Sequence, residues 1–271
     1  FLGLTGNWGT SIAGRLVAPR HGFLASIDPF GAGTVGQYRN VYTDGPVFGT
    51  AAWDPDRVDN AIAYVSPSFG GFNVTAAYAT SAIGQETPEN DADFKTVALL
   101  PRYTNGPLDV GFSYQRIKND ANVLLAIGDA KLTTLTFGGT YDFKVVKLGA
   151  FYDQTKLKSS LDPADGLKHK VWHLGVTVPF GKNAIQASYT QSKYSGGDLG
   201  LDGEKAKQWA IGYTYALSKR TNFYAAYSDI NNDDVRLAGV DDASNGAGIN
   251  VAGQRVDAYE RGIQFGLKHT F

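Results

Sequence analysis

The side chains with the clearest capacity for chemistry are four histidines and a short glycine-rich segment. His169 and His173 are four residues apart, a spacing that brings two imidazoles onto one metal only when the segment is a helix. On a strand they lie about 13 Å apart at the usual rise per residue, and no carboxylate is spaced to complete a site. We therefore expect both to be inner-face or loop-end residues of a strand rather than metal ligands.

Residues 31–36 (GAGTVG) match the GxGxxG pattern of dinucleotide-binding proteins. That pattern supports nucleotide binding only between a strand and a helix of a βαβ unit, and neither is visible around it. A loop packed tightly against a wall explains the glycines better. Nucleophilic catalysis would need a serine, a histidine and an orienting group together, but none of the histidines, including His21 and His269, is near a GxSxG pattern. We expect no catalytic residue and no obligatory cofactor.

Two acidic clusters, residues 231–234 and 241–242, could bind Ca²⁺ at a loop surface. They lack the regular ligand spacing of a dedicated calcium loop, so solvated charge explains them better. The formal net charge of -1 also argues against nucleic acid as a partner, because the chain has no overall basic footprint.

Composition favours many short strands joined by tight turns. The chain has 271 residues with 33 Gly, 15 Tyr, 15 Phe and no Cys. No run of 18 apolar residues is present, which excludes membrane-spanning helices. The absence of cysteine fits an exported protein without a disulfide framework.

The C-terminal segment 259–271 (YERGIQFGLKHTF) alternates bulky and polar residues, which is the period of a strand between two different solvents. In an outer-membrane barrel the apolar parity faces lipid and the polar parity faces a water-filled lumen, so the pattern must recur along the chain. It recurs in thirteen segments: 1–7, 9–17, 59–66, 72–80, 95–104, 108–117, 131–141, 146–156, 169–179, 184–193, 206–217, 222–230 and 259–271.

The links between these segments alternate strictly between short and long. The long links are 18–58, 81–94, 118–130, 157–168, 194–205 and 231–258. This alternation places all turns at one barrel end and all loops at the other, an asymmetry that a sandwich or propeller has no reason to keep. Aromatic residues beside the short turns, such as Trp8 and Phe180, should form an interfacial girdle. Thirteen strands would leave the barrel open, so an odd number of strands is expected to precede Phe1.

Several motifs of the sequence together resemble one family, the general porins of Gram-negative bacteria, in particular the trimeric, sixteen-stranded porins of beta-proteobacteria. The motifs are TGN at 5–7, DPFG at 28–31, NAIAYVSPSFGG at 60–71, LSKRT at 217–221 and the terminal KHTF at 268–271. The resemblance covers the whole chain as one domain, 1–271. It implies an all-β transmembrane antiparallel barrel of 16 strands with 13 in this chain, and the absence of three N-terminal strands.

The resemblance also implies a function. Segment 18–58 corresponds to loop 3, which folds into the lumen and narrows the pore, and Phe271 to the terminus read by the barrel-assembly machinery. We expect a passive diffusion channel for ions and small polar solutes. We also expect a homotrimer in the bacterial outer membrane, in contact with lipid and lipopolysaccharide.

Strand parity places the charges that could sort ions. A charge on the lipid face at mid-depth costs about 2 to 4 kcal/mol, so mid-strand charges are expected inside. By parity the inward cations are Arg15, Arg57, Arg102, Lys147 and Lys268, and the inward anions are Asp59, Asp109, Asp153 and Glu260. Lys205 and Lys207 fall on the apolar parity, at the loop end of their strand. With Asp28 and Arg39 of the long segment, the candidate constriction residues are Arg15, Arg57, Asp28, Arg39, Arg102 and Lys147.

The excess of one inward cation suggests a weak anion preference. A structural role, in which the arginines only hold the long segment through its carboxylates, is an alternative. A channel specific for sugars or organic anions is a second one; it would need an aromatic track, and only Phe151 and Tyr224 have inward parity. A soluble β-sandwich is a third, disfavoured by the loop asymmetry. Pro101, inside a strand, should mark a bulge.

Overall fold

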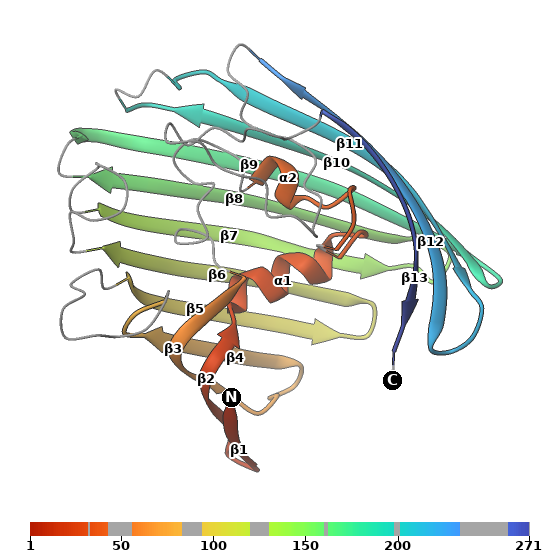
Figure 1. Cartoon of the computed structure of the whole chain (residues 1–271). Coiled ribbons are helices and arrows are strands. Elements are labelled where there is room, and N and C mark those ends of the chain that lie inside the picture. The colour runs from red at the N-terminus through yellow and green to blue at the C-terminus, as the bar shows by residue number, and fades with distance from the viewer. Residues whose placement is uncertain are drawn as a thin grey trace.

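The computed structural model describes residues 1–31, 33–42, 56–82, 94–119, 130–159, 162–197, 201–233 and 260–270. Thirteen strands within these ranges form one antiparallel sheet in which every strand pairs with its neighbour in sequence (Figure 1). The strands are β1 (Leu2–Gly6), β2 (Gly9–Val17), β3 (Arg57–Val65), β4 (Phe72–Ala79), β5 (Phe94–Asn105), β6 (Leu108–Asn119), β7 (Ala130–Asp142), β8 (Lys147–Ser159), β9 (Asp162–Phe180), β10 (Asn183–Ser195), β11 (Lys205–Ala216), β12 (Thr221–Asn232) and β13 (Arg261–His269). All thirteen predicted strands are present; the total of sixteen stays a prediction.

The two faces of the sheet meet different environments. In β11, Trp209 and Ile211 are exposed while Gln208 and Ala210 are buried. Register extends this division across the sheet, since Trp209 is paired with Tyr189 of β10 on the exposed side and Gln208 with Thr190 on the buried side. Exposed aromatic residues flank the short turns, among them Trp8, Phe143 and Phe180, as the girdle prediction requires.

One predicted long link is much shorter in the structure. β8 continues to Ser159 and β9 begins at Asp162, so these two strands form a long hairpin, with a register shift between Leu157 and Ser159. The predicted link 157–168 is therefore wrong. Its polar composition resembles a loop, but backbone pairing with the neighbouring strand extends both strands beyond the apolar alternation.

The predicted bulge at Pro101 is also wrong. Pro101 pairs with Val74 of β4, and the register with β6 is the same before and after it. Irregularity occurs instead in β3, where Gly14 pairs with Ala61 but Leu16 pairs with Val58. β3 thus contains one extra residue, and Asn60 there has a φ of 49°. This bulge reverses the parity of the residues that precede it.

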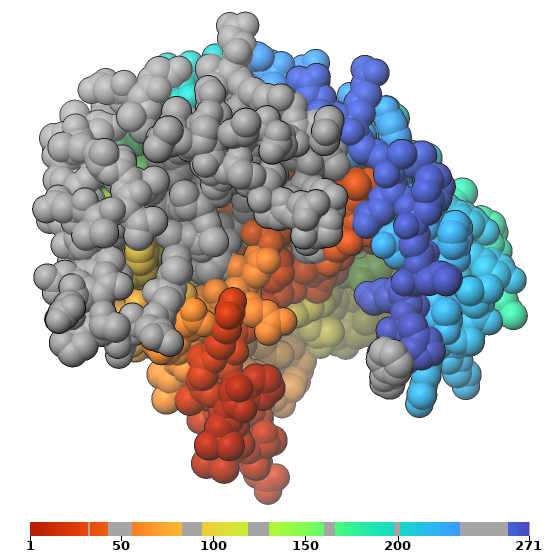
Figure 2. Space-filling view, in the orientation of Figure 1, coloured from red at the N-terminus to blue at the C-terminus, as the bar shows by residue number. Residues whose placement is uncertain are grey.

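The long segment between β2 and β3 folds back onto the inner face of the sheet. It contains two helices, α1 (Pro19–Ile27) and α2 (Arg39–Tyr42). α1 lies against β5 to β8, and α2 lies against β10 and β11. Figure 2 looks into the open side of the sheet, where atoms of this inserted segment are visible between β1 and β13. The prediction that segment 18–58 folds inward is confirmed for residues 18–31 and 33–42, whereas Arg57 and Val58 already belong to β3 of the wall.

In the described part of the chain, no helix is long and apolar enough to cross a membrane.

Candidate functional site

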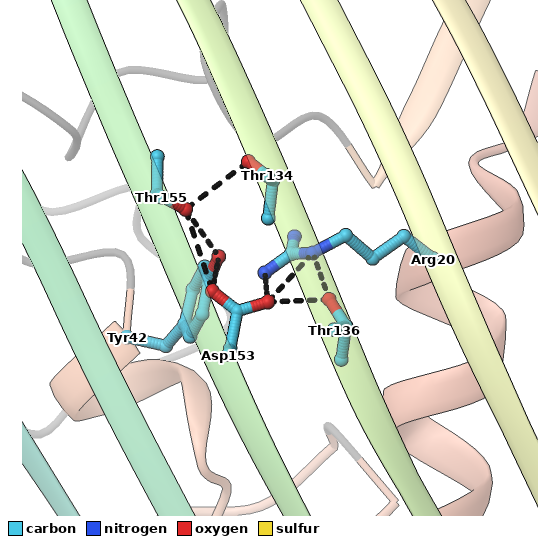
Figure 3. Close-up of polar contacts among 6 residues, drawn as sticks. All are labelled: Arg20, Tyr42, Thr134, Thr136, Asp153 and Thr155. Atoms are coloured by element: carbon cyan, nitrogen blue, oxygen red, sulfur yellow. Dashed lines mark hydrogen bonds and ion pairs between the residues drawn. The ribbon is translucent and has the colours of Figure 1, made fainter.

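A buried ion pair joins the inserted segment to the wall at the centre of the sheet. Arg20 of α1 donates from Nη2 to Asp153 Oδ2 of β8 at 3.0 Å, and both side chains are almost fully buried. Arg20 Nε also donates to Thr136 Oγ1 of β7 at 3.1 Å. Tyr42 of α2 donates its hydroxyl hydrogen to Asp153 Oδ1 at 2.8 Å, and the Arg20 guanidinium lies over the Tyr42 ring (Figure 3). Both helices therefore converge on one carboxylate.

A second group of polar contacts holds residues 29–40 against the later strands. Gln208 of β11 donates from Nε2 to the carbonyl oxygen of Gly36 at 2.9 Å, and it accepts from Asn40 Nδ2 at the same distance. Further along, the Val35 amide donates to Gln264 Oε1 of β13 at 3.0 Å. These bonds satisfy backbone groups that the segment would otherwise bury unpaired.

Glycines on the inner face let the inserted segment approach closely. A Cβ at Gly149 of β8 would lie 2.5 Å from the carbonyl oxygen of Ile27, and a Cβ at Gly175 of β9 would lie 2.5 Å from Pro29 Cδ. Both distances are shorter than any normal carbon contact, so only glycine fits at these positions. Other glycines beneath the segment are Gly111 under Phe23, Gly138 under Ile27 and Gly212 under Phe30. We call these five residues the glycine track.

Asp28 is not a pore-facing charge. Its carboxylate accepts hydrogen bonds from the backbone amides of Phe30 at 3.0 Å and Tyr38 at 3.1 Å, and its side chain is fully buried. Asp28 thus closes the turn after α1. The prediction that it faces permeating ions is wrong because the carboxylate is used to fold the segment itself.

Arg102 and Lys147 lie on the inner face as predicted. Arg102 of β5 is ion-paired with Asp109 of β6 and donates to Ser26 Oγ of α1 at 3.3 Å. Lys147 of β8 pairs in register with Thr177 of β9. It lines a cavity of about 160 Å³ between the wall and the end of α1, together with Ser26 and Asp28.

Arg39, at the start of α2, is ion-paired with Asp56, whose carboxylate is also 3.5 Å from His21 Nδ1. Asp56, near the end of the inserted segment, therefore contacts both α1 and α2, and the Arg39 side chain is about four-fifths buried. The other loop carboxylates considered, Asp44 and Asp54, lie outside the described residues.

The inward orientation predicted for Arg15 and Arg57 is wrong. Ser11 and Ala13 of β2 pair with Tyr64 and Ile62, which are exposed on the outer face, whereas Leu16 pairs with the buried Val58. Arg15 therefore points outward, where it is exposed and forms an ion pair with Asp59 at 3.2 Å.

Arg57 pairs with Val17, which is exposed, and so lies on the outer face as well. The predicted inward placement of Asp59 fails for the same reason, because it adjoins the bulge in β3. Simple alternation from Ile62 cannot account for the extra residue.

The two histidines of β9 lie on the inner face beneath the inserted segment. His169 stacks on Tyr194 with ring centroids 4.4 Å apart, and His173 stacks on Phe151 at 4.9 Å. Both are fully buried, so they pack the segment rather than line water. Across the described residues, no group of three His, Cys, Asp or Glu side chains could hold a metal ion. The acidic residues 234 and 241–242 lie outside this part of the chain.

Sequence reasoning missed the central role of Arg20. Asp153 was correctly placed inward by parity, and a carboxylate in mid-strand signals a buried partner. The partner lies 133 residues away in sequence, so no local pattern could identify it.

Taken together, an apolar outer face, a polar inner face and a segment fixed across the inner wall define a membrane-spanning β-barrel of the porin type. Comparison with known proteins agrees. The Gram-negative porin family model matches residues 1–235, and the chain belongs to this family. It is a β-barrel protein of the bacterial outer membrane.

Individual relatives support the same class of protein. The chain is 29% identical over 269 residues to outer membrane porin protein 32 of Delftia acidovorans, covering 99% of this chain and 72% of that protein. It is 34% identical over 159 residues to an outer membrane porin protein of Bordetella pertussis, covering 55% of this chain but only 39% of the relative. Among solved structures, the anion-selective porin from Comamonas acidovorans has a TM-score of 0.75 at 27% identity, covering 99% of this chain and 76% of that one.

Proposed function

We propose that the chain forms a passive, water-filled channel through which ions and small hydrophilic solutes diffuse across the outer membrane, with a weak preference for anions. The observation that carries this proposal is the inserted segment, which polar and packing contacts fix against the inner wall from β5 to β13. A rigid partition of this kind narrows a pore without closing it. No catalytic step and no cofactor form part of the proposal.

The position of one cation on the inner face supports anion preference. Asp153 is neutralised by Arg20, and Asp109 by Arg102. Lys147 and Lys268 are exposed on the inner parity, and so are the acids Glu260 and Asp142, of which Asp142 lies at the turn end of β7 in register with Lys147. These exposed charges balance in number, so the proposed preference rests on position: Lys147 lines the cavity between the wall and the end of α1, where a cation in a narrow, low-dielectric pore raises the local concentration of anions. The similar Comamonas porin is described as anion-selective, which supports the same direction.

Reversal potentials test this selectivity. The protein purified from outer membrane should give, in planar bilayers under a KCl gradient, a reversal potential of the sign set by chloride. Lys147→Glu should shift the potential toward cation selectivity, because it replaces an accessible cation by an anion inside the pore. Lys182→Glu makes the same charge change in the β9–β10 turn and should shift it much less. Cation preference of the wild-type channel would remove the proposal.

A channel dedicated to one solute class is less well supported. Of the two inward aromatic residues that could guide such a solute, Phe151 is buried beneath Tyr38, with ring centroids 5.4 Å apart. Because Phe151 is buried, Tyr224 alone does not form an aromatic track. Saturation of solute flux in loaded vesicles would favour the specific channel over simple diffusion.

The homotrimer implied by the resemblance is part of the same proposal. Outer-membrane porins of this kind would assemble through the lipid-facing side of the wall, and the complex should survive mild detergent. Gel electrophoresis of unheated and heated samples, with chemical cross-linking, would count the subunits. A single monomer band under both conditions would contradict this part.

A further inference from the structure

The cavity beside Lys147 lies on the turn side of the inserted segment, where α1 ends against the wall. The inserted segment contributes residues 26–29 to its lining, and β8 and β9 contribute Lys147, Gly149, Gly175 and Thr177. Its volume of about 160 Å³ gives room for about five water molecules at roughly 30 Å³ each. Because two of the four wall residues are glycines, Lys147 and Thr177 supply the side-chain polar groups of the wall side.

Lys147 is a cation available to a ligand. Among the described residues, its amino group has no hydrogen-bond or ion-pair partner, although Asp109 is near enough to interact with it electrostatically. Asp109 is itself ion-paired with Arg102. The register partner of Lys147 on β7, Asp142, accepts a hydrogen bond from the Lys144 amide at 2.7 Å and does not line the cavity. The charge of Lys147 is therefore free to attract an anion into the cavity.

Two hydroxyl groups accompany this cation. Thr177 pairs with Lys147 in register, which places their Cβ atoms about 5 Å apart. In the part of the chain that the structure describes, the Thr177 hydroxyl has no hydrogen-bond partner. On the opposite side, Ser26 Oγ donates to the carbonyl oxygen of Phe23 at 2.7 Å and accepts from Arg102 Nη2 at 3.3 Å. Thr177 thus offers an unused donor beside Lys147, whereas the Ser26 donor is already used.

Asp28 is the one acid that lines the cavity, and its carboxylate is occupied by the fold. Oδ1 accepts from the Phe30 amide and Oδ2 from the Tyr38 amide, so backbone dipoles compensate its charge. A cation therefore fits the cavity less well than an anion, because it would meet Lys147 and find the Asp28 oxygens already used. The remaining negative charge of Asp28 keeps anion binding weak. Weak binding suits a solute in transit, which must leave the site again.

We propose that this cavity is a transient binding site for one small oxyanion of the size of phosphate, on the turn side of the inserted segment. Lys147 supplies the charge, and the Thr177 hydroxyl donates one hydrogen bond to the anion. The inference rests on the channel function proposed above and adds to it a place where the anion stops. Charge spread along a pore raises the anion concentration without saturating. A site built from Lys147 and Thr177 saturates, and it holds one anion at a time.

Inorganic phosphate is the probe for a direct test. A titration followed by phosphorus NMR line broadening, with the protein in a phosphate-free detergent, should saturate for the wild type. Lys147→Gln should weaken phosphate binding about tenfold or more, and Thr177→Val, which keeps the side-chain shape, by a smaller factor. The matched control is Lys268→Gln. It removes another exposed cation of inner parity at a turn end, outside the cavity, and should bind phosphate like the wild type.

The outcomes separate the site from the channel. Unchanged phosphate binding by Lys147→Gln overturns the proposal, and so does equal weakening by Lys268→Gln, which would attribute binding to the general charge of the pore. Conductance of the same wild-type preparation in KCl reports the channel function independently. A protein that conducts but shows no saturable phosphate binding contradicts the site alone. A protein that binds phosphate at Lys147 but does not conduct contradicts the proposed channel function and leaves the binding site standing.

Discussion

Asp153 is the side chain of the wall on which both helices of the inserted segment converge. It receives hydrogen bonds from Arg20 and Tyr42, one from each helix of the inserted segment. Fully buried ion pairs contribute little net stability compared with apolar packing, but removing one partner leaves an uncompensated charge. The Arg20–Asp153 pair therefore fixes the position of the inserted segment more than it stabilises the fold.

Asp153→Asn should therefore loosen the inserted segment and destabilise the protein by about 3 to 5 kcal/mol, since Arg20 loses its counter-charge inside the wall. Single-channel conductance should rise or become noisy, and the denaturant midpoint should fall. The control is Asp229→Asn, which removes an outward pair with an exposed Arg261 and should cost at most about 1 kcal/mol. Wild-type conductance and stability in Asp153→Asn would show that other contacts suffice.

Across the strands, the glycine track sets how close the inserted segment comes to the wall. A side chain at Gly149 would meet a backbone atom, the carbonyl oxygen of Ile27. Such an atom cannot rotate out of the way as the end of a flexible side chain can. The position of the segment therefore depends on small residues contributed by five different strands.

Gly149→Val should push Ile27 and Pro29 away from β8, and the change should appear as altered conductance and lower stability. Ala150→Val adds similar volume to the next position of the same strand, but on the exposed outer face, and should leave conductance unchanged. Bilayer recordings of both variants would decide. Equal behaviour of the two would mean that the segment does not rest on the track.

The sequence predicted each strand because alternation is a local property that every pair of neighbouring residues repeats. Orientation was predicted correctly for Arg102, Lys147 and Asp153, which lie in strands of regular register. It failed for Arg57 because one residue at positive φ, Asn60, inserts a bulge that alternation does not reveal. It failed for Arg15 because the apolar residues Ile12 and Leu16 lie on the inner face, where they pair with the buried Ala63 and Val58. Contacts of the inserted segment could not be predicted, since they join residues more than 100 positions apart.

The whole sheet separates two solvents, and this property can be tested independently of conduction. Phe137 is about three-fifths exposed on the outer face in the middle of β7. Phe137→Arg should reduce the free energy of folding into a bilayer by about 2 to 4 kcal/mol, because the charge faces hydrocarbon. Thr177→Arg, which faces the inner cavity beside Lys147, should cost far less. Denaturant titrations in lipid vesicles would measure both, and equal penalties would contradict the assignment of the two faces.

The hydrogen bond from the Val35 amide to Gln264 links the inserted segment to β13, and the two residues are 229 positions apart in the sequence. Contacts of such long range form late, after the intervening chain has been ordered. A nascent wall to which β13 has not yet been added thus lacks one of the hydrogen bonds that hold the inserted segment in place. During biogenesis the pore would therefore be wider and more permeable before β13 joins the sheet than after it.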